Sequence, residues 1–125
     1  MRKRHIYLAG PMRGLPKFNF PAFDAAAAKL RSEGHDVFNP AECDRERMGV
    51  DMSERSRSGS ETQAMRKYGF DLREALLADL TYICATADTV AVLPDWENSM
   101  GVAAELATAR ALNLDIIFLE RYHDQ

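Results

Sequence analysis

The residues best suited to chemistry lie in the segment 99–106, around a carboxylate in an apolar stretch. Glu105 is the only charged residue between Glu97 and Arg110, and it follows Gly101 by four positions. On a helix this spacing puts both on one face. Ser99 is of the residue type that caps a helix start, where an anion such as phosphate is favoured. Because Gly101 has no side chain, a ligand could reach past the backbone to the Glu105 carboxylate. The segment predicts a ligand site or, as the alternative, a solvent-facing charge.

A second glycine-bearing loop follows an apolar run near the start of the chain. The run Ile6–Ala9 ends at Gly10, and Arg13 and Gly14 come next. Glycines allow close backbone approach, and the arginine guanidinium is a fork of N–H donors that matches a phosphate. The loop is weak evidence by itself, because most glycines after a strand only shape turns.

The apolar pattern alternates strands with helices along the whole chain. Strands are expected at Ile6–Ala9, Asp36–Phe38, Thr89–Leu93 and Asp115–Leu119, and helices from Asn19 to Gly34, over Asp71–Ala85 and from Ser99 onward. This alternation predicts one α/β domain over residues 1–125, a Rossmann- or flavodoxin-like three-layer sandwich with a parallel sheet of four to five strands.

Such a sheet would bring the two loops together. In a flavodoxin-like order, the strands at 6–9 and 89–93 are neighbours at the switch point, where ligands bind beyond the carboxyl ends of the strands. Asp95 and Trp96 follow the second of these strands and would border the same crevice. Trp96 could stack on a nucleobase, although a packing role is the alternative.

The segment from Asp44 to Arg66 breaks the pattern. It is polar and rich in arginine and serine, and it predicts a flexible loop. The alternative is an arginine-bearing flap that closes over an anionic ligand.

Composition excludes several classes of function. The net charge of −3 gives no basic face for nucleic acid. The histidines and the cysteines Cys43 and Cys84 lack metal-ligand spacing, so no metal or cofactor is expected, and Cys84 is expected in the core. The first apolar run is too short for a signal peptide or a membrane span, which predicts a soluble, cytoplasmic protein.

The helix expected over Asp71–Ala85 predicts an assembly. Tyr82, Ile83 and Cys84 give it apolar residues on more than one face. Helices of this kind pack against something beyond their own sheet, and two-fold dimers are the commonest assembly. A homodimer is therefore expected. The alternative is a monomer in which the segment 44–66 covers this face.

Three blocks together resemble the nucleoside 2-deoxyribosyltransferase superfamily, and most of all its nucleoside 5′-monophosphate N-glycosidase branch. They are Tyr7-Leu8-Ala9-Gly10-Pro11-Met12-Arg13-Gly14, Asp79-Leu80 and Ser99-Met100-Gly101-Val102-Ala103-Ala104-Glu105-Leu106. The resemblance implies that Glu105 is the nucleophile at the sugar anomeric carbon and that Tyr7 lies beside it. It also implies that Asp79 assists at the base or orients the sugar, and that Arg13 and Ser99 hold the 5′-phosphate.

The residues leave some roles open. Asp95 rivals Asp79 as the second acid, and Asp79 could equally be an ordinary helix-surface carboxylate. Pro11 stands where relatives often have a hydroxyl residue, and it has no N–H to offer a phosphate. The expected activity is hydrolysis of the N-glycosidic bond of a (deoxy)nucleoside 5′-monophosphate. The alternatives are a nucleoside 2-deoxyribosyltransferase and a non-catalytic nucleotide-binding module.

Overall fold

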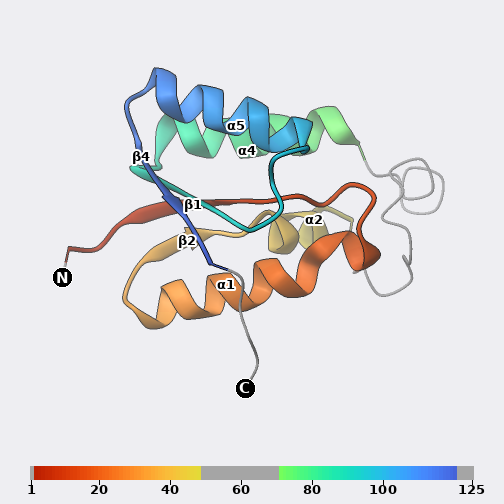
Figure 1. Ribbon diagram of the computed structural model, residues 1–125, viewed down its shortest axis with the longest axis horizontal. Coiled ribbons are helices and arrows are strands. Elements are labelled where there is room, and N and C mark those ends of the chain that lie inside the picture. The colour runs from red at the N-terminus through yellow and green to blue at the C-terminus, as the bar shows by residue number, and fades with distance from the viewer. Residues whose placement is uncertain (1, 49–70, 121–125) are drawn as a thin grey trace.

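A parallel four-stranded sheet organises the computed structural model, which describes residues 2–48 and 71–120. Its strands lie in the order β2-β1-β3-β4 (Figure 1). They are β1 (His5–Ala9), β2 (Asp36–Phe38), β3 (Thr89–Val92) and β4 (Asp115–Phe118). The predicted α/β sandwich is confirmed, with four strands in the described part of the chain.

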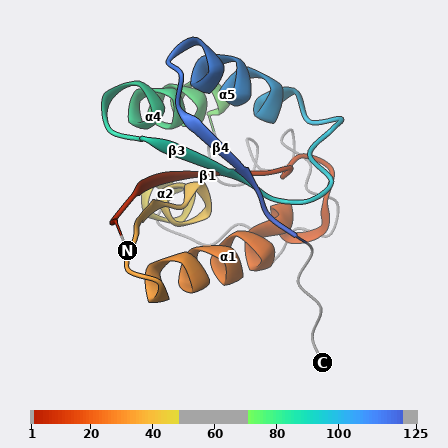
Figure 2. The ribbon, with the colours of Figure 1, turned by 60° about the vertical axis from the view of Figure 1, so that its left-hand side comes forward.

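Helices cover both faces of this sheet, which makes three layers (Figure 2). One face carries α1 and α2, and the other carries α4 and α5 side by side. The helices are α1 (Phe20–Ser32), α2 (Pro40–Met48), α4 (Leu72–Ala85) and α5 (Met100–Ala111), and a short 3-10 turn, η1 (Pro16–Asn19), precedes α1.

Strand β1 sends alternate side chains into two cores. Ile6 and Leu8 pack on the α1 side, where Phe20 and Phe23 are buried. Tyr7 points the other way, into the core beneath α4 and α5. This period of two is inherent in a strand, and it aims the Tyr7 hydroxyl at the inner face of α5.

The two helices above Tyr7 begin at side-chain caps. The Asp71 carboxylate accepts from the backbone N–H of Arg73 at 2.9 Å at the start of α4. The Ser99 hydroxyl oxygen accepts from the N–H of Val102 at 3.2 Å at the start of α5, as the sequence predicts. Each cap supplies an acceptor to a backbone donor that has no partner within the helix.

The polar segment expected as a loop from Asp44 does not begin there, because α2 continues to Met48. The helix starts at Pro40, a residue favoured in a first turn, and the Asn39 side-chain oxygen accepts from the N–H of Ala41 at 3.0 Å. Arg45 then pairs with Asp24 of α1. These contacts stabilise a helix in a charged segment whose sequence pattern does not predict one. Residues 49–66 lie outside the described residues.

None of the helices in the described ranges is long and apolar enough to cross a membrane.

Candidate active site

A buried carboxyl–phenol pair lies at the centre of the candidate site. The Tyr7 hydroxyl donates to Oε2 of Glu105 at 2.7 Å. Glu105 is only 6% exposed and projects from the second turn of α5 toward β1. The solvent-facing alternative for Glu105 is therefore wrong.

Burial changes the acidity of this carboxyl. Desolvation raises the pKa of Glu105 to about 8, the hydrogen bond from Tyr7 opposes the rise, and the charge of Asp79 adds to it. A pKa near 8 means that Glu105 holds a proton at neutral pH. A carboxyl with a pKa near the working pH is typical of groups that exchange protons during a reaction.

Asp79 belongs to the same electrostatic group. The pKa of Tyr7 is raised well above its usual value, first by burial and then by the charges of Glu105 and Asp79, with hydrogen bonds to both carboxylates contributing. Asp79 is half-buried on the inner side of α4. The structure thus brings together the three residues to which the resemblance assigns catalysis.

The carboxyls of Glu105 and Asp79 lie at the wall of a large cavity. Its volume is about 1720 Å³, and both Glu105 and Asp79 line it. Pockets for single small ligands are commonly about 300–1,000 Å³, so the cavity exceeds the needs of a mononucleotide. It extends along α1, where Ala26 and Leu30 form part of its wall.

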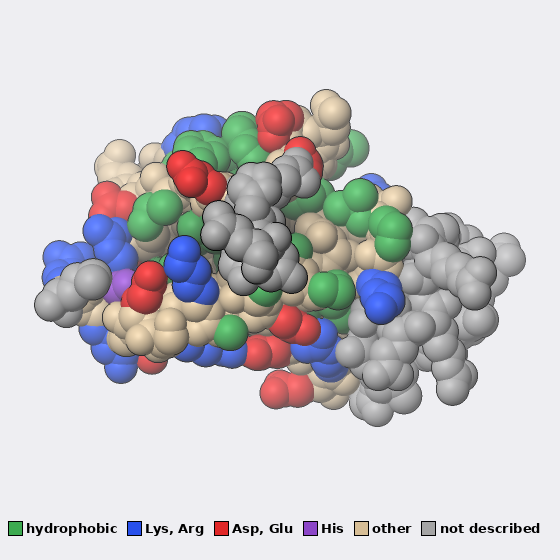
Figure 3. All heavy atoms as spheres, turned by 60° about the horizontal axis from the view of Figure 1, so that its bottom comes forward, with side chains coloured by type: hydrophobic (Ala, Val, Ile, Leu, Met, Phe, Trp, Pro, Cys, Tyr) green, Lys and Arg blue, Asp and Glu red, His purple; other side chains and the backbone are tan. Residues whose placement is uncertain are grey.

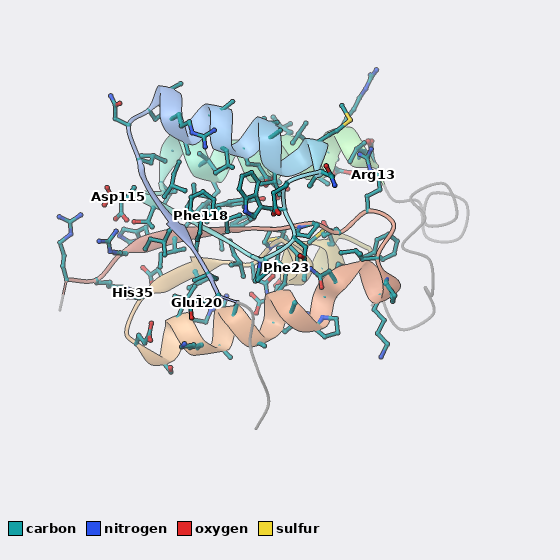
Figure 4. The ribbon with its side chains drawn as sticks, viewed as in Figure 1. Arg13, Phe23, His35, Asp115, Phe118 and Glu120 are labelled. Atoms are coloured by element: carbon teal, nitrogen blue, oxygen red, sulfur yellow. The ribbon has the colours of Figure 1, made fainter. Side chains whose placement is uncertain are left out.

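One end of the cavity is suited to an anion. Ser99, Gly101 and Arg13 all line it, and Figure 4 shows Arg13 on the side where α4 and α5 begin. Among the described residues, a methyl group added at Gly101 would meet only the Ser99 hydroxyl oxygen, at 3.9 Å, outside the backbone of its own helix. The helix start is therefore open to a ligand, as the positive end of a helix dipole must be to bind phosphate.

The two glycines of the first loop, Gly10 and Gly14, are required for different reasons. Gly10 lines the cavity, and a Cβ on it would lie 2.7 Å from a side-chain carbon of Leu93, so packing requires a glycine there. Gly14 is not among the cavity-lining residues described, and its φ of +80° explains the glycine instead.

The two predicted site residues in the loop after β3, Asp95 and Trp96, lie in different surroundings. Asp95 is exposed and lines the cavity. Trp96 is not among the residues that line the cavity, and its ring packs on Phe118 with centroids 5.3 Å apart. This geometry favours the packing alternative for Trp96, and its stacking on a base stays a prediction.

The sequence reasoning missed Asp44 as a cavity residue. This carboxylate from α2 is only 5% exposed and lines the same cavity as Arg13. The signal that could have placed Asp44 is Asn39-Pro40, which begins α2 directly after the strand expected at Asp36–Phe38. Among the described residues, no group of three or more histidine, cysteine or acidic side chains is arranged to hold a metal ion.

A scan against protein families matches residues 4–118 to the family described as Domain of unknown function (DUF4406). The chain belongs to the DUF4406 family. The match runs from the residue before β1 to the end of β4. The matched range therefore includes Tyr7, Asp79 and Glu105, of which Asp79 and Glu105 line the cavity. A search of curated proteins found no match.

Proposed function

We propose that this DUF4406 protein is an N-glycosidase that hydrolyses a (deoxy)nucleoside 5′-monophosphate to free base and sugar 5-phosphate. The observation that carries the proposal is the buried Tyr7–Glu105 hydrogen bond at the wall of a cavity, one helical turn from the open start of α5. Cleavage of an N-glycosidic bond builds positive charge at C1′, and a carboxylate at that point can stabilise or trap it.

The two carboxyls divide the acid and nucleophile roles by sharing one proton. Glu105 holds this proton at neutral pH before substrate binds, since its pKa is about 8. In the reactive form Asp79 carries it and Glu105 is ionised, with the Tyr7 hydroxyl donating to its charge. Asp79 suits the acid role better than Asp95, because Asp79 is coupled electrostatically to both Glu105 and Tyr7.

In the first step, a Glu105 oxygen forms a bond to C1′ as the C1′–N bond breaks. The electron pair of the broken bond leaves with the base, and Asp79 transfers its proton to the base nitrogen. A glycosyl ester on Glu105 results, as in retaining glycosidases.

In the second step, water attacks C1′ while the Asp79 carboxylate takes one of its protons. The bond from C1′ to Glu105 breaks, and its electron pair returns to the carboxylate. The sum is nucleotide plus water giving base plus sugar 5-phosphate, and the pair again holds one proton.

The phosphate would sit at the start of α5. Arg13 would contribute charge-assisted hydrogen bonds there, and the helix dipole would favour the anion. The Ser99 hydroxyl oxygen already accepts from Val102, so its own proton is the one it would donate. Pro11 is buried and offers no N–H, so among the described residues Arg13 and the helix start are the proposed phosphate contacts.

The buried carboxyl favours an enzyme over a non-catalytic nucleotide-binding module. A binder gains nothing from Glu105 near a bound phosphate, because its ionised form would repel the anion and its burial lowers stability. A transferase would use the same first step and differ only in accepting a base in place of water.

A panel of nucleosides and their 5′-monophosphates tests this proposal directly. Free base released from monophosphates, detected by chromatography, is expected. Arg13→Ala should weaken the binding of monophosphates by about 1–3 kcal/mol and leave the binding of nucleosides unchanged. Arg73→Ala, an exposed arginine on α4, is the matched control. Release of base only when a second base is supplied would instead indicate the transferase.

We also propose that the working unit is a homodimer. The sequence argument for a dimer, the apolar residues on more than one face of α4, is weaker in the structure. Ile83 is fully buried within its own subunit, and the Tyr82 ring packs on Phe38 in a tilted arrangement with centroids 4.6 Å apart. Cys84, expected in the core, is exposed. The exposed apolar side chains that remain on α4 include Leu77, which is 68% exposed.

A further inference from the structure

Asp44 is a buried carboxylate of the cavity that the proposed chemistry does not use. It lies on α2, is only 5% exposed and lines the same cavity as Asp79 and Glu105. Burial of a carboxylate lowers stability unless hydrogen-bond donors compensate it. A few polar groups of this kind at the wall of a cavity usually fix the orientation of a ligand and select it.

The neighbours of Asp44 hold it in a fixed direction. The next residue, Arg45, pairs with Asp24 of α1, and its guanidinium lies 5.1 Å from the centre of the Phe20 ring. Successive residues of a helix point about 100° apart. Because Arg45 is anchored on α1, the direction of the Asp44 side chain toward the cavity wall is fixed as well.

The order of the strands places Asp44 across the site from the proposed phosphate position. β1 lies between β2 and β3, with α2 following β2 and α5 following β3. Phe38 at the end of β2 lies opposite Tyr7, which contacts Glu105. Neighbouring strands are about 4.8 Å apart, so the ends of β2 and β3 are separated by about 10 Å. A nucleotide with its phosphate at the start of α5 and its C1′ at Glu105 then extends its base toward α2.

The chemistry of a carboxylate favours one kind of base. An ionised carboxylate accepts hydrogen bonds and donates none. Guanine alone among the common bases offers it two neighbouring donors, N1–H and the N2 amino group. Adenine and cytosine place an acceptor nitrogen beside their amino group, and thymine and uracil place carbonyls beside their single N–H. Asp44 also interacts within the chain, but a carboxylate has about four acceptor positions.

We propose that Asp44 selects guanine, so that the substrate is a guanine (deoxy)nucleoside 5′-monophosphate. This inference rests on the proposed function, from which it takes the nucleotide and the place of its phosphate. The two Asp44 oxygens accept from N1–H and from the N2 amino group of the base. The nitrogen that can take the proton of Asp79 is N7, in the other ring of guanine, so the two carboxyls act on different parts of the base.

The charges along the cavity also favour a base that is rich in donors. Besides Asp44, the carboxyl groups of Asp79 and Asp95 line it, whereas Arg13 is assigned to the phosphate. Carbonyl oxygens of a base carry partial negative charge and are disfavoured beside carboxylates. Acidic and basic side chains are interspersed on the outer surface of the α1 side (Figure 3). Selection by charge is therefore a property of the cavity and not of this surface.

The test is the affinity of 2′-deoxynucleoside 5′-monophosphates that differ only in the base. Their binding is measured by calorimetry to the full chain carrying Glu105→Gln, which lacks the proposed nucleophile. The guanine nucleotide should bind most tightly. The hypoxanthine nucleotide, which lacks only the N2 amino group, should bind about ten- to hundredfold more weakly, because one hydrogen bond to a charged group is lost. Equal affinities for these two nucleotides would overturn the inference, and this comparison needs no substitution at Asp44.

Asp44→Asn in the same background tests the residue itself. An amide offers one donor and one acceptor, a pattern that pairs with adenine. The preference for guanine over hypoxanthine should disappear, and the adenine nucleotide should bind more tightly than before. Glu46→Gln, an exposed glutamate on the same helix, is the matched control and should keep the preference. Equal weakening of every monophosphate by Asp44→Asn would reduce Asp44 to a structural role and overturn the inference.

Failure of the proposed function gives a different result. Guanine-selective binding that depends on Asp44, with no base released by the wild type, would overturn hydrolysis and support the selection by Asp44. Absence of binding for every monophosphate would overturn both.

Discussion

Tyr7 and Glu105 lie 98 residues apart in the sequence, and their hydroxyl and carboxyl groups are 2.7 Å apart in a buried hydrogen bond. The bond joins the central strand β1 to helix α5, and it holds the Glu105 carboxyl at the wall of the cavity. The same burial that positions the carboxyl raises its pKa to about 8. Stability and proposed chemistry are therefore coupled at one side chain.

The first prediction concerns stability. The pKa of Glu105 rises from 4.5 to about 8 on folding. Both the folded and the unfolded chain are protonated at this residue below pH 4.5, so its burial costs little there. As the pH rises toward 8, only the unfolded chain ionises, and the wild type loses stability. Glu105→Gln has no such loss and can still accept from Tyr7.

Thermal unfolding at several pH values checks this. The melting temperature of Glu105→Gln should exceed that of the wild type by an amount that grows from pH 4.5 to about 8 and then levels off. A difference that is independent of pH would show that Glu105 is ionised in the folded chain.

The second prediction concerns the pH dependence of activity. If Glu105 and Asp79 share one catalytic proton, kcat/KM should fall as the pH rises above about 8, where that proton is lost. The slope should approach about tenfold per pH unit, as for a single ionisation. In Asp79→Asn, kcat/KM should be low, and its decrease at alkaline pH should be absent. A wild-type rate that climbs through pH 8 would mean that Glu105 only needs to ionise and that Asp79 is not the acid.

The third prediction separates positioning from packing at Tyr7. The Tyr7 hydrogen bond lowers the pKa of Glu105, so Tyr7→Phe should raise that pKa further and make the ionised form scarcer. A hydrogen bond to a charged group contributes about 1.5–3 kcal/mol, which predicts a loss in kcat of about tenfold or more.

Tyr82→Phe is its control, because the Tyr82 ring lies 6.5 Å from the Tyr7 ring and contributes to the same core. Equal losses in both variants, with no alkaline shift of the pH profile in Tyr7→Phe, would reduce Tyr7 to a packing role.

The fourth prediction concerns the open start of α5. A methyl group at Gly101 meets no other part of the described chain closer than 3.9 Å, and alanine is favoured over glycine in a helix by about 1 kcal/mol. Gly101→Ala should therefore stabilise the free protein and raise KM for a monophosphate that approaches the helix backbone. Gly10→Ala should destabilise it, because its Cβ would clash with Leu93. An unchanged KM in Gly101→Ala would place the ligand elsewhere.

Much of this arrangement follows from the sequence because hydrophobic periodicity determines it. The strands and the switch point between β1 and β3 are where the pattern predicts them, and Ser99 caps α5 as expected. That β1 and β3 are paired is what brings the Gly10 and Asp95 loops to one cavity.

The rest depends on tertiary contacts that no local pattern encodes. The helix at Asp44–Met48 depends on pairing with α1, and Trp96 is drawn to Phe118 of an edge strand. Cys84 lies in an apolar stretch but faces outward, because its neighbour Ile83 takes the buried side of α4.

The most direct test of the proposed activity is the rate of base release from deoxynucleoside 5′-monophosphates by the wild type and by Glu105→Gln. Glu97→Gln, an exposed glutamate in the loop before α5, is the matched control. We expect release by the wild type and by Glu97→Gln, and a loss of at least about two orders of magnitude in Glu105→Gln, because nucleophilic and electrostatic contributions disappear together. Near-equal release by Glu105→Gln and wild type, or no release of base from any monophosphate, would contradict the account.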